Sequence, residues 1–128
     1  MTEFLDKKTY VKQAETVIGK LNRKRDNSGE IAVSSSQLRN LLTLTNELYN
    51  AVLHDKNDKL SEDVQSRAQY IKMKIAYSAG RDRNVKNFVE CSNIMDYIDM
   101  IGDSRDRLMT VCHYMEALVA YHKFLSEE

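Results

Sequence analysis

SEDVQSRAQYIKMKIAYSAGRDRNVK, residues 61–86, carries the clearest helical pattern in the chain. Ser61 is a suitable N-cap, because its hydroxyl can accept a hydrogen bond from a backbone N–H of the first helical turn. Apolar residues then recur at the spacing of one helix face. They are Val64, Ala68, Ile71 and Ile75. Gly80 is placed to end the helix, since glycine adopts the left-handed conformation at no steric cost.

Basic and aromatic side chains line a second flank of this helix at spacings of three and four residues. They are Arg67, Tyr70, Lys74 and Tyr77. Lys72 lies on the opposite flank, and the turn after the helix is also basic. The charged residues of this turn are Arg81, Asp82, Arg83 and Lys86. Such a surface can bind a polyanion by charge, with base stacking added by the tyrosines, and the alternative is a solvated flank whose tyrosines widen the contact with the core.

The composition favours an all-helical protein of one domain. The chain has 128 residues, no proline and four glycines, with 42% hydrophobic and 30% charged residues. A chain of this size can bury one sizeable core, and the scarcity of helix breakers suits long helices. The formal net charge is zero, so no global field attracts the protein to nucleic acid or membrane. Any basic function must therefore come from local clustering of charge.

Cys91 and Cys112 both fall on predicted apolar faces. They form no Cys-x-x-Cys pair, so we expect two reduced thiols in the core. No apolar run approaches the ~18 residues of a membrane span, and the N-terminus shows no signal-peptide core. We therefore expect a cytoplasmic protein.

Four further amphipathic segments complete the predicted fold. They run from Thr2 to about Asn22, from about Ser36 to His54, from about Val85 to Met100 and from about Arg105 to Leu125. Residues 34–36, Asn84 and Ser104 are candidate N-caps, and Gly102 separates the last two segments. Short connectors favour antiparallel neighbours. The prediction is all-α, a compact antiparallel bundle of about five helices in a single domain, residues 1–128.

A polar and basic connector follows the first predicted helix. It reads Arg23-Lys24-Arg25-Asp26-Asn27-Ser28-Gly29, and Lys20 adds to its positive charge. Such charge runs are typical of mobile, solvated loops. The alternative is a disordered basic arm that settles on phosphates. We therefore divide the domain into residues 1–33, which hold the first helix and this flexible connector, and residues 34–128.

The sequence offers no constellation for catalysis. The histidines at 54, 113 and 122 lack the spacing of metal ligands, and we expect His122 to be a core residue satisfied by a hydrogen bond. Cys112 lies about 15 Å from it along the helix axis, too far for proton transfer. Acidic residues around the fourth connection lack the paired Glu-x-x-Glu spacing of helical pyrophosphohydrolases. We therefore expect no enzyme, no metal site and no cofactor, and we disfavour a nucleotide hydrolase.

Three strings give the chain a family resemblance. The most specific is EALVAYHK at Glu116–Lys123, and the others are YIKMKIAY at Tyr70–Tyr77 and QLRNLL at Gln37–Leu42. In this order they resemble the small helical subunit of type III-A CRISPR effector complexes, the Csm family. The resemblance covers roughly Ser35 to Lys123, which makes residues 34–128 the family-like core.

This resemblance implies a non-catalytic role in an antiviral ribonucleoprotein. In that family, several copies stack beside the backbone subunits that hold the guide RNA, and they line the channel where target RNA pairs with the guide. Target cleavage belongs to the backbone subunits, and the DNase and cyclic-nucleotide activities belong to the large subunit. Because pairing with the guide supplies sequence specificity, the small subunit needs only contacts to the RNA backbone.

Six basic residues are our candidates for phosphate contacts. They are Arg39, Lys72, Lys74, Arg81, Arg83 and Lys86. Tyr70 and Tyr77 are candidates for base stacking, and Arg39 either pairs with an acidic neighbour or points at a phosphate near a helix N-terminus. The expected partners are target RNA and its duplex with guide RNA, other copies of the chain, and the backbone and large subunits. The alternative is a purely structural helical adaptor that contacts protein but not RNA.

Overall fold

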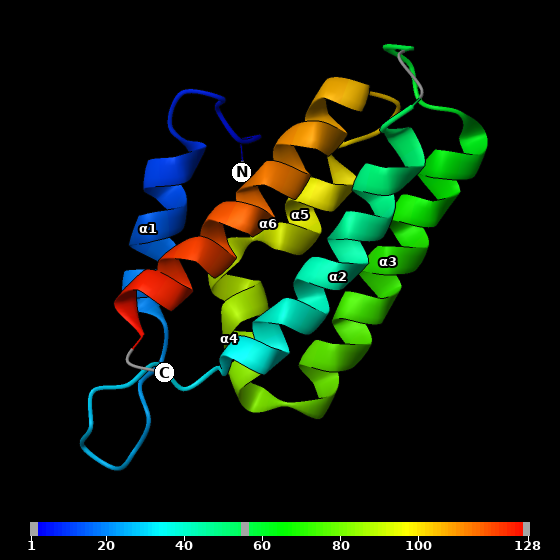
Figure 1. Ribbon diagram of the computed structural model, residues 1–128. Helices are drawn as coiled ribbons and strands as arrows, with labels where there is room; N and C mark the ends of the chain where they lie inside the picture. The colour runs from blue at the N-terminus through cyan, green and yellow to red at the C-terminus, as the bar shows by residue number, and fades with distance from the viewer. Residues whose placement is uncertain (1–2, 55–56, 127–128) are drawn as a thin grey trace.

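In a computed structural model that describes residues 3–54 and 57–126, the chain forms six α-helices and no strand (Figure 1). The helices are α1 (Tyr10–Lys20), α2 (Ser35–Val52), α3 (Glu62–Arg81), α4 (Arg83–Ser92), α5 (Ile94–Asp99) and α6 (Arg105–Leu125). The expected all-α class is confirmed. None of the helices within these two ranges is long and apolar enough to cross a membrane.

Four helices lie side by side in the order α1, α6, α2, α3, and α4 and α5 cover one side of this layer (Figure 1). The helix α2 runs opposite to both of its neighbours, as expected of an antiparallel bundle, whereas α1 and α6 run in the same direction (Figure 1). The predicted inner face of α3 is buried. Its members are Val64, Ala68, Ile71 and Ile75, and Ala79 extends it.

The predicted fourth helix is two helices, which gives six helices in place of about five. Asn93 interrupts it with a left-handed backbone conformation, φ 58° and ψ 24°. Asparagine tolerates this conformation better than other residues with a side chain, apart from aspartate. The predicted N-cap Asn84 is also wrong, because α4 begins at Arg83 and Asp82 caps it. The apolar pattern continues across the interruption, so periodicity alone does not reveal it.

The junction of α3 and α4 is organised by Asp82. Gly80 lies inside α3, without a left-handed backbone, so the prediction that it ends the helix is wrong. Asp82 is extended, with φ −143° and ψ 121°, and it both ends α3 and caps α4. Its Oδ1 accepts hydrogen bonds from the backbone N–H of Asn84 at 2.8 Å and of Val85 at 3.1 Å. Its Oδ2 accepts one from the Gln37 Nε2 of α2 at 2.9 Å.

The first helix is shorter than predicted. The expected start at Thr2 lies outside the described residues, and residues 3–9 are not helical. Leu5 in this segment is nevertheless buried, and the ring of Phe4 packs edge-on against Tyr97 at 6.0 Å between centroids. The segment therefore contributes to the core without helical structure.

Three predicted helix starts are confirmed by their caps, and at α3 the Ser61 hydroxyl accepts the backbone N–H of Val64 at 3.2 Å. The Ser34 hydroxyl accepts the backbone N–H of Gln37, whose side chain returns a bond to the Ser34 N–H. This reciprocal pair is a capping box. The Ser104 hydroxyl caps α6 in the simpler way, by accepting the N–H of Arg107 at 3.1 Å. Gly102 has φ 54° and separates α5 from α6 as expected.

The polar groups of the core have partners, as the His122 prediction requires. His122 is 2% exposed, and its Nε2 donates to the carbonyl oxygen of Val33 at 2.8 Å. The hydroxyl of the buried Tyr114 donates to the Ser92 carbonyl at 2.9 Å. Both cysteines are free: Cys112 is buried, and Cys91 is half-buried. Burial raises the pKa of the Cys112 thiol to about 12, so this thiol stays protonated at neutral pH.

We expect Asp82→Ala to lower the free energy of unfolding by about 1 kcal/mol, because it removes the N-cap of α4. Asp82→Asn keeps a capping oxygen and is the matched control. Urea denaturation followed by far-UV circular dichroism measures both. Equal stability of Asp82→Ala and the wild type would contradict the capping role.

The Asp82 cap also predicts that the stability of the folded protein depends on pH. The hydrogen bond from Val85 is the largest cause that lowers the pKa of Asp82 below 3.8, and those from Asn84 and Gln37 act in the same direction against the effect of burial. A carboxyl with a lowered folded-state pKa contributes stability above its unfolded pKa and loses it as the pH falls through the folded value. The stability advantage of wild type over Asp82→Asn should therefore shrink below about pH 4.

Candidate nucleic-acid interface

An exposed ridge on α3 combines apolar and basic side chains. We define the α3 ridge as Tyr70, Met73, Lys74, Tyr77 and Arg81. Tyr70, Met73 and Tyr77 are 53%, 57% and 67% exposed, so the tyrosines do not widen the core contact. The ridge lies opposite the buried face of the same helix, which is why the fold leaves it uncovered.

Each tyrosine of the ridge carries a cation over its ring. The Lys74 Nζ lies 5.0 Å from the centroid of Tyr70, and the Arg81 Cζ lies 5.4 Å from the centroid of Tyr77. Both pairs are four residues apart, which is the spacing that brings side chains together on a helix. Such cation–π contacts hold a long cationic side chain along the helix surface. The ridge therefore presents charge and aromatic surface together.

An open groove of about 530 Å³ lies beside the ridge, between α2 and α3. Its lining residues are Asn40, Leu44, Met73, Lys74, Tyr77, Ser78 and Arg81. The two helices are antiparallel neighbours (Figure 1), and both contribute residues to the groove. The groove is partly apolar with cations at its edge, so it suits a ligand that has flat rings and negative charge.

The turn between α3 and α4 adds unpaired positive charge. Arg81, Arg83 and Lys86 are exposed. In the part of the chain that the structure describes, none of them pairs with a carboxylate. Asp82 lies between the arginines, but its oxygens already accept bonds from the α4 backbone and Gln37. The turn therefore has a net positive surface.

Two of the six predicted phosphate contacts lie apart from this surface. The Lys72 Nζ is 2.7 Å from the Asp99 carboxylate of α5, on the other flank of α3. Arg39 is exposed and lines a separate small hollow between α2 and α6, beside Lys123. The structure thus brings together Lys74, Arg81 and the start of α4. It places Lys72 in an ion pair, which argues against a phosphate role.

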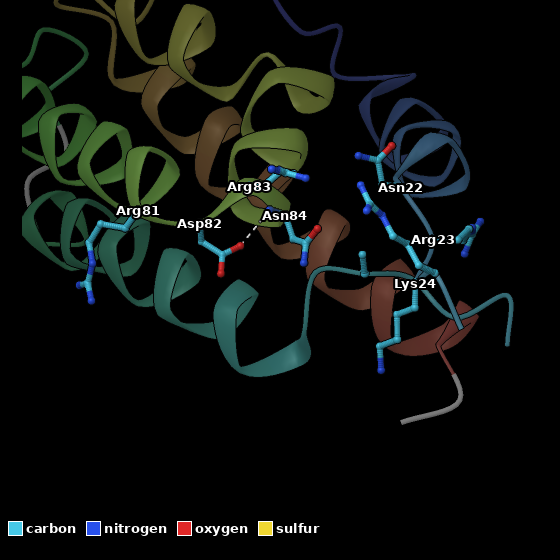
Figure 2. Close-up of a pocket in the computed structure, with 9 residues that line it drawn as sticks. Asn22, Arg23, Lys24, Arg81, Asp82, Arg83 and Asn84 are labelled. Atoms are coloured by element: carbon cyan, nitrogen blue, oxygen red, sulfur yellow. Dashed lines mark hydrogen bonds between the residues drawn. The ribbon is translucent and has the colours of Figure 1, made fainter. Parts of the chain in front are cut away.

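A second hollow joins the α3–α4 turn to the connector between α1 and α2. It has a volume of about 770 Å³ and is lined by Asn22, Arg23, Lys24, Arg25, Ala32, Arg81, Asp82, Arg83 and Asn84. We call it the connector hollow. Figure 2 shows Arg83 and Asn84 on one side and Asn22, Arg23 and Lys24 on the other, with Arg81 beyond Asp82. The sequence reveals the charge of the connector, but nothing in it places this charge beside Arg83.

Hydrogen bonds hold the connector in place. The backbone N–H of Asn22 donates to the Asn87 Oδ1 of α4 at 2.9 Å. The two arms of the connector then pair, with Lys24 N–H donating to Glu30 O and Ala32 N–H to Asn22 O, each at 2.8 Å. Buried Ile31 also attaches the return arm to the core, and the flexibility that the polar sequence predicts for the connector stays a prediction.

The described residues show no gathering of three His, Cys, Asp or Glu side chains that could hold a metal ion. The acidic side chains near the α5–α6 connection are instead spread among separate ion pairs. Asp99 pairs with Lys72, Asp103 lies 3.9 Å from Lys59, and Asp106 pairs with Lys7.

We expect a double-mutant cycle of Lys72→Ala and Asp99→Ala to give a coupling energy of about 0.5 kcal/mol, as for other partly exposed ion pairs. The Lys72 and Asp99 side chains are 27% and 47% exposed, so solvent screens their attraction. Denaturation of the two single variants and the double variant measures the coupling. Zero coupling in low salt would show that Lys72 is not tied to α5.

Comparisons with known proteins cover nearly the whole chain. The family model for Csm2 Type III-A matches residues 7–128. The "CRISPR system Cms protein Csm2" of Mycobacterium tuberculosis is 40% identical over 116 residues, 91% of this chain and 90% of the relative. The protein of the same name from Streptococcus thermophilus is 39% identical over 120 residues, 94% and 93% of the two chains. That from Enterococcus italicus is 37% identical over 119 residues, 87% and 85%.

Proposed function

Because this chain belongs to the Csm2 family, it is a subunit of a type III-A CRISPR complex, and we propose that it holds target RNA there by sequence-independent contacts to the RNA backbone. Its role is non-catalytic, and several copies stack along the channel in which target RNA pairs with guide RNA. The observation that carries the proposal is a group of cations without carboxylate partners among the described residues, together with two exposed tyrosines, all between Tyr70 and Lys86. The family match starts at residue 7, so residues 7–34 belong to the family unit as well.

Charge supplies the affinity in this proposal. Phosphates that meet lysine or arginine release condensed counterions, which makes binding favourable and dependent on salt. Lys74 and Arg81 lie in the second half of α3, and Arg83 and Lys86 lie in the first turn of α4; none of the four has a carboxylate partner among the described residues. A protein of zero net charge can therefore still offer a strand a local positive track.

The tyrosines supply contacts that every base can make. Tyr70 and Tyr77 expose more than half of their surface, and each has a cation over its ring. Stacking of a base on such a ring contributes about 1–3 kcal/mol and depends little on the identity of the base. This chemistry suits a subunit whose target changes with each guide, since the guide alone reads the sequence.

The ends of α3 carry opposite charge, which suits stacking of copies. Glu62 and Asp63 lie in its first turn, and Arg81 lies in its last turn. These ends lie at opposite ends of the bundle (Figure 1). Complementary charge on two surfaces favours one orientation of neighbouring copies and steers their encounter.

The second candidate function is a structural adaptor that contacts only protein. Met73 and Phe124 are 57% and 77% exposed, and Leu44, Met73 and Tyr77 contribute apolar surface to the lining of the α2–α3 groove. Exposed apolar side chains of this size are frequent in protein interfaces. In this function the α3 ridge contacts a neighbouring subunit. Charge reversal on the ridge would then weaken assembly of the complex, whereas in the RNA-binding function it would weaken RNA binding.

We expect Arg81→Glu with Lys86→Glu to weaken target RNA binding by the assembled complex on the order of tenfold at moderate salt, with a shallower salt dependence. Both side chains are exposed, so helical content should not change. Filter binding over a series of salt concentrations measures the effect.

Lys12→Glu with Lys59→Glu is the matched control, since it changes net charge equally at exposed positions away from the ridge. Unchanged affinity of the Arg81 and Lys86 variant would contradict the proposed contacts. Loss of assembly with normal RNA crosslinking would favour the adaptor instead.

A further inference from the structure

We propose that the connector hollow is a second phosphate-binding site, in which Arg23 and Arg25 of the connector and Arg83 of α4 hold the RNA backbone between the two segments. This inference rests on the proposed RNA role of the α3 ridge and extends it to a segment outside that ridge. The ligand class is a phosphodiester strand. The cations of two segments some sixty residues apart in the sequence line one hollow.

The charges of the hollow favour an anion. Five cations and one carboxylate line it. The carboxylate, Asp82, is already engaged by the α4 backbone and Gln37, and Lys24 is paired with Glu30 at 2.8 Å. The arginines therefore provide the available charge. Guanidinium groups suit phosphate because their planar donors can bind two oxygens at once.

The arginines of the connector retain donors for a ligand. Arg23 donates through Nη2 to the Gly19 carbonyl at 3.3 Å, which uses one of its five N–H groups. Arg25 is exposed and has no hydrogen bond or ion pair among the described residues. Concentration of cations in one hollow raises the local density of anions beyond the effect of single surface charges.

The contacts of the connector with the rest of the fold lower the entropic cost of binding RNA. Its pairing with α4 through Asn22 and Asn87, and with the core through Ile31 and Val33, holds the two arms of the connector, including the backbone at Arg23. A disordered arm would lose conformational entropy on contact with RNA, and a segment held in place loses less. The connector thus forms part of the site before RNA binds, unlike a disordered arm that becomes ordered only on binding.

Continuity with the ridge points to a strand in preference to a small anion. Arg81 lines both the connector hollow and the α2–α3 groove beside Tyr77. No aromatic side chain lines the hollow itself, as far as the described residues go, which suits sugar and phosphate better than a base. A strand whose base stacks on Tyr77 can therefore pass Arg81 and place its next phosphates in the hollow.

The test compares full-length wild type with Arg23→Glu plus Arg25→Glu in binding a fluorescein-labelled single-stranded RNA of mixed sequence. We expect affinity to fall on the order of tenfold at moderate salt, and the slope of log affinity against log salt to fall by about 0.7 for each phosphate that the variant no longer neutralises. Lys12→Glu with Lys59→Glu is the matched control of equal charge change and should bind as wild type. Arg25→Glu alone removes no hydrogen bond of the described chain and serves as the variant that preserves the fold.

Arg81→Glu with Lys86→Glu, measured in parallel, separates the two proposals. If that pair weakens binding and the connector pair matches the control, the inference about the hollow is overturned and the ridge proposal stands. If neither pair weakens binding, both proposals fall. If the connector pair disturbs complex assembly but leaves RNA crosslinking of the complex intact, the hollow binds an acidic protein surface and the inference is overturned.

Discussion

The carboxylate of Asp82 is the constraint on which the proposed interface depends. It stops α3, starts α4 and receives a hydrogen bond from Gln37, which in turn completes the capping box at the start of α2. Three helices and the end of the connector are thereby fixed around one side chain. The residues on either side of it are arginines, and the extended backbone at Asp82 sends one toward the α3 ridge and the other toward the connector hollow (Figure 2). A negative group thus organises a positive surface.

The distinction between paired and unpaired cations matters more here than total charge. Lys24 and Lys72 are close to carboxylates, and such pairs at the surface contribute little stability and attract a polyanion weakly. The cations of the ridge and of the α3–α4 turn have aromatic rings or solvent as neighbours. A chain with equal numbers of acidic and basic residues can therefore confine its positive potential to one end.

Local signals predict much of this structure, and contacts distant in sequence decide the rest. The caps Ser34, Ser61 and Ser104 and the buried face of α3 follow from short patterns. The break at Asn93 escapes prediction because the apolar pattern runs through it. The permissive backbone of Gly80 suggests a helix end there, whereas α3 ends at Asp82, which caps α4 locally and also accepts a hydrogen bond from Gln37, 45 residues away. In the candidate site, the α3 ridge can be predicted from helical spacing. The pairing of Lys72 with Asp99 and the position of the connector cannot, because both depend on contacts between segments far apart in the sequence.

The hydrogen bond from His122 to Val33 joins positions 89 residues apart. It joins the end of the connector to α6, and this contact can form only after α6 has been synthesised. During translation, α1 and the connector are synthesised before α6. Until that contact forms, the return arm of the connector lacks its attachment to α6, and the order of synthesis thus sets the order in which the walls of the proposed site can assemble.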